Sequence, residues 1–193
     1  MAARRGHLIG VFGLFWDAEF VPFWEFGRTS VPLLGQRGAN SRTRVIVDFR
    51  KAVGSYVLYN DYGPTYTGIA TSPGLGARLH DHRINPPRDT PWTRFSWFAF
   101  GDVHDLSGHT GWGEVNPRDR PVATDADTNV RELEALIIQL LGTHQAQMKF
   151  QVAKEWGQLP WWDAEGLCRG DKVDPRGFPK RWVKRWNEKP PAI

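Results

Sequence analysis

Residues 54–82 constrain the fold of this chain more than any other stretch. Two tyrosines, Tyr56 and Tyr66, stand ten positions apart, and each belongs to a tripeptide that also contains a glycine. Arg78 and His82 follow four positions apart on a predicted helix, which makes them neighbours on its surface. Two phenols, a guanidinium and an imidazole in one short stretch indicate a chemical site. We expect the rest of the chain to complete this site or to bring it a substrate.

The stretch is predicted to form a hairpin followed by a helix. Residues 56–59 and 65–67 contain the aromatic and β-branched residues that favour strands, and the residues between them are turn formers. Ser72 followed by Pro73 is typical of a helix start, so we expect the helix to begin at about Pro73. The helix should end at Asn85, because two prolines follow it.

A third strand and a second helix are predicted further along. Residues 93–100 are mostly apolar, which is typical of a covered strand, and residues 129–141 have a helical pattern that Gly142 ends. At about 100° per residue, the apolar side chains of this helix form a broad arc, with Glu134 inside the arc and Glu132 outside it. A carboxylate on an inward apolar face is costly unless it is paired or binds a cation.

The length of 193 residues fits one domain with extensions. We divide the chain into an aromatic, basic N-terminal extension (1–51), a central domain (52–148) and a Trp-rich, basic C-terminal extension (149–193). The single cysteine, Cys168, excludes an internal disulfide framework and favours a reducing, cytoplasmic location. Because no apolar run approaches about 20 residues, no membrane partner is expected.

Charge is unevenly distributed. Residues 1–51 carry eight basic and four acidic residues (+4), residues 52–167 nine and fourteen (−5), and residues 168–193 eight and three (+5). Basic flanks of this kind either hold a polyanion or are solvated tails. The candidate phosphate contacts in the flanks are Arg37, Arg42, Arg44, Lys180, Arg181, Lys184 and Arg185. Tryptophans interleave the last four, where they would stack on bases or anchor a terminal helix.

Three further segments have weaker patterns. Residues 8–26 are dense in aromatic side chains and are expected to form a strand or two that pack on the core. The alternative for this segment is a surface for a protein partner or a second copy of the chain. Residues 27–44 are basic and Gly-rich, and residues 101–128 lack periodicity, so both are expected to be loops.

Five elements in order resemble the GIY-YIG nuclease domain, over roughly residues 50–148. They are Gly54-Ser55-Tyr56, Tyr66-Thr67-Gly68, the segment 75–79 with Arg78, His82 four positions later, and the segment 134–138 with Glu134. The resemblance implies an α/β (α+β) fold in which helices flank a small, three-stranded, mainly antiparallel sheet. It also implies that Tyr56, Tyr66, Arg78 and Glu134 converge on one concave site.

The activity implied by this resemblance is that of a metal-dependent endonuclease that hydrolyses phosphodiester bonds in DNA. Glu134 would hold one Mg²⁺ (or Mn²⁺) ion, Arg78 would clamp the phosphate, and one tyrosine would orient or deprotonate the attacking water. His82 would accept a proton or fix a tyrosine hydroxyl. The sequence distinguishes neither DNA from RNA nor the roles of Tyr56 and Tyr66.

A second hypothesis is a nucleic-acid-binding or assembly subunit that retains the nuclease fold without its activity. Polar Ser55 and Thr67 occupy the middle of the two tripeptides, where the family usually has a small aliphatic residue. Tight binding of DNA without cleavage would favour this hypothesis over the first.

Overall fold

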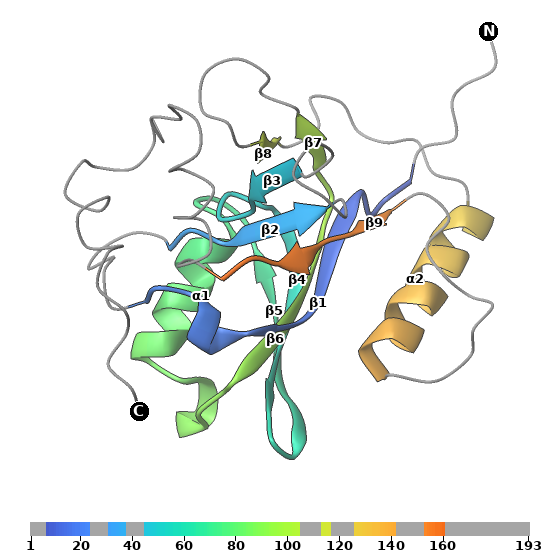
Figure 1. The fold of residues 1–193 in the computed structure, drawn as a ribbon. Helices are drawn as coiled ribbons and strands as arrows, with labels where there is room; N and C mark the ends of the chain where they lie inside the picture. The colour runs from blue at the N-terminus through green and yellow to red at the C-terminus, as the bar shows by residue number, and fades with distance from the viewer. Residues whose placement is uncertain are drawn as a thin grey trace, which may run out of the picture.

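The computed structural model describes residues 7–23, 31–37, 45–104, 113–116, 126–141 and 153–160. In these residues, ten strands form two five-stranded sheets, and two α-helices lie on opposite sides of the first sheet (Figure 1). The mixed α+β composition confirms the general fold class expected from the sequence. No helix in the described part of the chain is long and apolar enough to cross a membrane.

The first sheet, sheet A, has the strand order β5-β4-β6-β1-β9. Its strands are β1 (Val11–Asp17), β4 (Gly54–Asn60), β5 (Gly63–Ala70), β6 (Arg94–Ala99) and β9 (Lys154–Glu155). The three predicted strands are neighbours in it, and β4 pairs antiparallel with both β5 and β6. However, the expected three-stranded sheet is wrong in extent, because β1 and β9 continue it beyond β6.

The second sheet, sheet B, has the strand order β10-β2-β3-β8-β7. Its strands are β2 (Leu34–Arg37), β3 (Val45–Asp48), β7 (Asp102–His104), β8 (Gly113–Asn116) and β10 (Gly157–Gln158). The expectation that residues 27–44 and 101–128 are loops is therefore wrong for β2, β7 and β8. These strands are only three or four residues long, which is too short for an alternation of apolar and polar residues to identify them.

Large aromatic side chains fill the core. The ring of Trp97 on β6 lies 4.5 Å from the ring of Phe49 and 5.2 Å from that of Trp16, measured between centroids. Trp156 from the C-terminal extension contacts Phe49 at 5.2 Å. The predicted extensions thus share one core with the central domain. The aromatic N-terminal segment packs largely into this core, as expected, although Phe15 remains 45% exposed.

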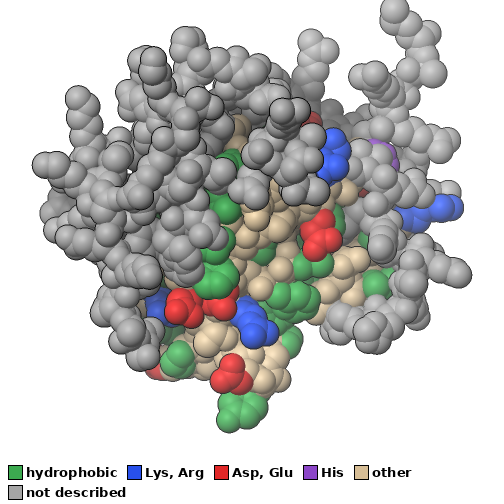
Figure 2. Space-filling model, viewed as in Figure 1, with side chains coloured by type: hydrophobic (Ala, Val, Ile, Leu, Met, Phe, Trp, Pro, Cys, Tyr) green, Lys and Arg blue, Asp and Glu red, His purple; other side chains and the backbone are tan. Residues whose placement is uncertain are grey.

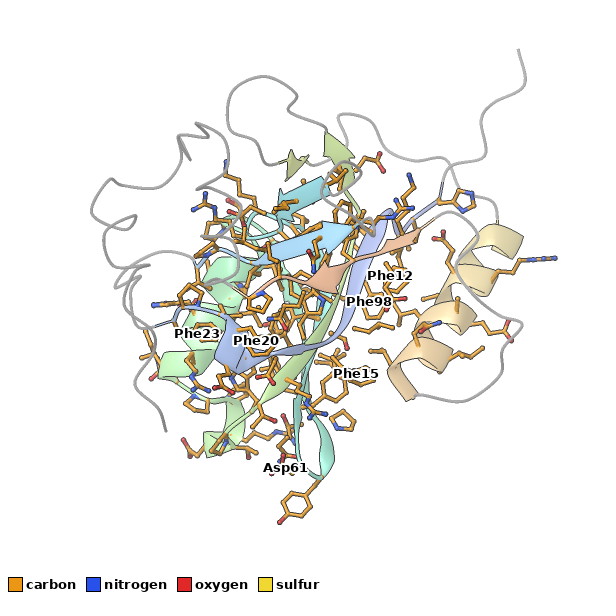
Figure 3. All side chains as sticks on the ribbon, in the orientation of Figure 1. Phe12, Phe15, Phe20, Phe23, Asp61 and Phe98 are labelled. Atoms are coloured by element: carbon orange, nitrogen blue, oxygen red, sulfur yellow. The ribbon has the colours of Figure 1, made fainter. Side chains whose placement is uncertain are left out.

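The two helices cover opposite faces of sheet A. Helix α1 (Leu75–Ile84) packs with Trp97, whereas helix α2 (Ala126–Leu141) packs with Phe98. Successive residues of a strand point to opposite faces, so these neighbours on β6 mark the two sides. Figure 3 agrees, since Phe12, Phe15 and Phe98 lie on the α2 side and Phe20 and Phe23 on the α1 side. Two short 3₁₀ turns, η1 (Ala18–Phe20) and η2 (Pro87–Asp89), complete the described elements.

The start of α1 differs from its prediction. The helix begins at Leu75 with Gly74 as its N-cap, at a φ of 117°, so Ser72 and Pro73 precede the helix. A Cβ atom on Gly74 would lie 2.6 Å from the carbonyl oxygen of Arg50, so the close approach requires glycine. The Leu75 N–H donates to the Ala52 carbonyl at 3.0 Å, which satisfies a helix-end donor without a side-chain cap.

Candidate active site

The hairpin and α1 bring two tyrosines and a histidine into contact. Tyr56, in the middle of β4, is only 1% exposed, and its hydroxyl oxygen lies 2.6 Å from His82 Nε2. The ring centroid of Tyr66, on β5, lies 4.8 Å from that of His82 and 6.2 Å from that of Tyr56. Three elements therefore contribute one aromatic ring each, on the α1 face of sheet A.

The two signature glycines are required by packing. A Cβ atom on Gly68 would lie 2.5 Å from the Tyr56 hydroxyl oxygen and 2.8 Å from Cε1 of Tyr66. A Cβ atom on Gly54 would collide with the carbonyl oxygen of Phe98 on the neighbouring strand. Gly68 therefore leaves room for both phenols, and Gly54 allows β4 and β6 to pair closely.

Arg78 lies one helical turn before His82 on α1, and its side chain is exposed. Its positive charge lowers the pKa of Tyr56 and the pKa of His82, so it acts on both partners of the Tyr56–His82 hydrogen bond. Arg78 is therefore part of the same electrostatic environment as the two aromatic groups. We call Tyr56, Tyr66, Arg78 and His82 together the Tyr/His/Arg site.

Burial keeps the central pair of this site neutral near pH 7. It is the main cause that raises the pKa of Tyr56 above that of free tyrosine, and Tyr66 adds to this effect. Burial is also the main cause that lowers the pKa of His82, with Asp81 opposing and Arg78 reinforcing it. A neutral imidazole has an unprotonated ring nitrogen, so His82 is suited to accept a proton.

Helix α2 does not bring Glu134 to this site. The helix packs through Ala135 on Phe12 and Phe98, on the face of sheet A opposite to Tyr56 and α1. Glu134 is half-buried and stands one turn before Ile137, which is 52% exposed. The expected convergence of Glu134 with the tyrosines and Arg78 is therefore wrong, because the sheet separates them.

Glu132 is the buried carboxylate of α2, at 6% exposure, which corrects the prediction that it faces outward. Its carboxylate accepts hydrogen bonds from the backbone N–H groups of Leu8, at 2.7 Å, and Ile9, at 3.2 Å. It also lies 3.1 Å from His7 Nδ1. The role of Glu132 is thus to hold the segment before β1 against α2.

The described residues do not fit the one-ion site that the resemblance implies, because sheet A separates Glu134 from the Tyr/His/Arg site. Mg²⁺ is usually held by one or two carboxylates together with water and substrate phosphates, so a carboxylate close to the phosphate site is required. In the part of the chain that the structure describes, no group of three or more His, Cys, Asp or Glu residues is arranged to hold a metal ion. The carboxylate whose charge acts on His82 and Tyr56 is that of Asp81, on the same helix.

The predicted nucleic-acid contacts fall mostly outside the described residues. Arg37 ends β2 in sheet B with an exposed side chain. Six others lie outside the described ranges: Arg42, Arg44, Lys180, Arg181, Lys184 and Arg185. On the face in Figure 2, the basic and acidic side chains of the described residues are interspersed, without a patch of one sign.

Sequence reasoning missed Glu132 and Asp81. Glu132 carries no local signal, because its partners are more than 120 positions away. Asp81 does carry one, since it lies one turn after Arg78 and next to His82.

No protein-family model, no curated protein and no solved structure matches this chain.

Proposed function

We propose that this chain is an endonuclease that hydrolyses phosphodiester bonds of nucleic acid, DNA above all, at the Tyr/His/Arg site. The observation that carries the proposal is the 2.6 Å contact between the Tyr56 hydroxyl and His82 Nε2, with the Tyr66 ring against the same imidazole. The resemblance to the GIY-YIG domain adds the reaction class. The single Cys168 suits a cytoplasmic enzyme.

Each residue has a role in hydrolysis. Arg78 binds the non-bridging phosphate oxygens with its planar guanidinium. The oxygen of a water molecule attacks phosphorus, a new P–O bond forms, and the bond to the leaving oxygen breaks. One proton of the water passes to Nδ1 of His82, whose Nε2–H donates to the Tyr56 hydroxyl, and the leaving oxygen takes a proton from solvent. The tyrosine hydroxyls orient the imidazole and the water.

The direct test is a cleavage assay on plasmid, linear duplex, single-stranded DNA and RNA. We expect nicking or linearisation of duplex DNA. Each substrate is incubated with Mg²⁺, with Mn²⁺ and with a chelator, because the metal requirement stays a prediction that comes from the resemblance. Absence of cleavage on all four substrates, by folded protein, contradicts the proposal.

A nucleic-acid-binding subunit without activity is the second candidate. The position of α2 favours it, because Glu134 lies across the sheet from the Tyr/His/Arg site. This candidate predicts DNA binding in a gel-shift or anisotropy assay with no product under any metal condition. Cleavage that is lost on substitution of Arg78 excludes it.

Cleavage is expected to depend on pH through His82. Its pKa is lowered below 6.5 by burial, so the imidazole is neutral at pH 7 and becomes protonated only as the pH falls below 6.5. Protonated His82 cannot accept the proton of water, so the rate should be lost on this acid side and retained between about pH 7 and 8. Asp81→Asn removes a charge that raises the His82 pKa, so it should move the acid limb to lower pH. An acid limb that Asp81→Asn leaves in place contradicts this assignment.

A further inference from the structure

We propose that the two tyrosines have different roles. Tyr56 is a positioning residue that holds His82, whereas Tyr66 is the tyrosine that contacts the substrate. This inference rests on the proposed function, since it divides the work within the Tyr/His/Arg site.

Tyr56 is enclosed by its surroundings. Its side chain is 1% exposed and belongs to the main core, and its hydroxyl is in short contact with His82 Nε2. The Gly68 backbone passes so close to the phenol that a methyl group would not fit there. A phosphodiester cannot reach a group buried to this degree without displacing the core around it. Tyr56 can therefore act on the reaction only through its neighbours, and its shortest contact is with His82 Nε2.

Tyr66 lies at the open side of the same cluster. It is on β5, the edge strand of sheet A, and it is half-buried where Tyr56 is fully buried. Its ring stands edge-on to His82, at 62° and 4.8 Å. Tyr66 raises the pKa of Tyr56 through its proximity and as a side-chain hydrogen-bond partner. Because a hydroxyl can both donate and accept, one contact with Tyr56 leaves the Tyr66 hydroxyl able to bind a substrate as well.

Arg78 extends the open side of the site. Its side chain is exposed on α1, one turn from His82, so a phosphate bound by the guanidinium lies outside the buried pair. A substrate at this position meets Arg78, Tyr66 and the accessible part of His82. Both residues are tyrosines, so their chemistry is the same. The division of roles follows from burial, because Tyr56 is buried and Tyr66 is partly exposed.

The chain offers a matched control in Tyr59. This tyrosine is on the same strand as Tyr56, is 6% exposed, and has a hydroxyl without a hydrogen-bond partner. Burial raises the pKa of Tyr59 and the nearby Ser96 hydroxyl lowers it, but no described atom meets hydrogen-bond geometry with the Tyr59 hydroxyl. Tyr59→Phe therefore removes a buried hydroxyl from β4 without touching the site.

The test compares Tyr56→Phe, Tyr66→Phe and Tyr59→Phe. Two measurements are made: the His82 imidazole titration by NMR, and the pH profile of kcat and KM for cleavage of duplex DNA. For His82 to accept a proton at Nδ1, its Nε2–H must donate to the Tyr56 hydroxyl, which favours the imidazolium. Tyr56→Phe should therefore lower the pKa of His82 and move the acid limb of cleavage to lower pH. Tyr66→Phe should reduce kcat/KM by about 10²-fold and leave the His82 titration unchanged. Tyr59→Phe should change neither.

Any other pattern overturns the division of roles. Tyr56 is not the residue that holds His82 if Tyr56→Phe leaves the pKa of His82 unchanged. The division also fails if Tyr66→Phe changes this pKa, alone or together with Tyr56→Phe. Failure of the proposed function is recognised separately, because it leaves the wild-type protein without cleavage. In that case the NMR titration still tests Tyr56, and the affinity for a duplex oligonucleotide tests Tyr66. Weaker binding by Tyr66→Phe, with unchanged binding by Tyr56→Phe, supports the division, whereas the reverse overturns it.

Discussion

Arg78→Ala is expected to reduce cleavage by about 10³-fold while the protein remains folded. In the described residues, the guanidinium is the cation whose charge acts on both Tyr56 and His82. Its removal leaves the negative charge that develops on the phosphate without this partner. Because the side chain is exposed on α1, the melting temperature should change little. Arg78→Lys keeps the charge but loses the bidentate fork, so its activity should be intermediate.

A second measurement separates a direct role of Arg78 from a structural one. Arg78 lowers the pKa of His82, so Arg78→Ala should raise this pKa and move the residual acid limb to higher pH. Arg83→Ala is the matched control on the same helix. The Arg83 guanidinium lies 5.7 Å from the Phe23 ring and donates to the Trp92 carbonyl at 3.5 Å, so its loss should affect stability and not cleavage. Full activity of Arg78→Ala, or equal losses in both variants, contradicts the proposed site.

The hairpin and α1 could be predicted from the sequence because their signals are local. Strand-forming residues flank the turn at Gly63, and the helix ends at Asn85 before two prolines. The spacing of four between Arg78 and His82 places both on one side of the helix. The contact between Tyr56 and Tyr66 follows from the hairpin, since the register pairs Tyr56 with Gly68, two positions from Tyr66.

Long-range pairing could not be predicted in the same way. β1 completes sheet A beside β6, some eighty positions away, and the β1 ladder is interrupted by an irregularity between Gly13 and Trp16. Phe15, within this irregularity, has a φ of 50°, and its N–H donates to Ser96 Oγ. Such a break removes the period of two that identifies a strand. For this reason the aromatic N-terminal segment shows no clean period.

The face of α2 that meets the sheet could not be predicted because the apolar residues of this helix spread over a broad arc. Leu133 and Ile137 are each 52% exposed, whereas Ala135 is buried. A broad arc does not say which of its edges meets the sheet. Here the choice depends on Phe12 and Phe98 from sheet A and on backbone donors near the N-terminus, none of which the helix sequence contains.

Glu132→Ala is expected to destabilise the fold by about 3 kcal/mol, and Glu134→Ala by much less. Glu132 is the acceptor for the N–H groups of Leu8 and Ile9, and its loss leaves two backbone donors without this carboxylate. Glu134 makes no hydrogen bond or ion pair with the described residues, so its removal leaves none of their polar groups without a partner. Urea or thermal unfolding of both variants measures the difference.

The same pair of variants decides what α2 contributes to function. Sheet A separates Glu134 from Tyr56 and His82. Glu134→Ala should therefore retain the stability and the cleavage rate of the wild type. Glu132→Ala should lose activity only in proportion to the unfolded fraction, and Glu132→Gln should recover part of it by restoring one acceptor oxygen. Loss of cleavage in a fully folded Glu134→Ala variant would instead support the metal-binding role that the resemblance implies. That result would require α2 to reach the opposite face of the sheet in the active protein.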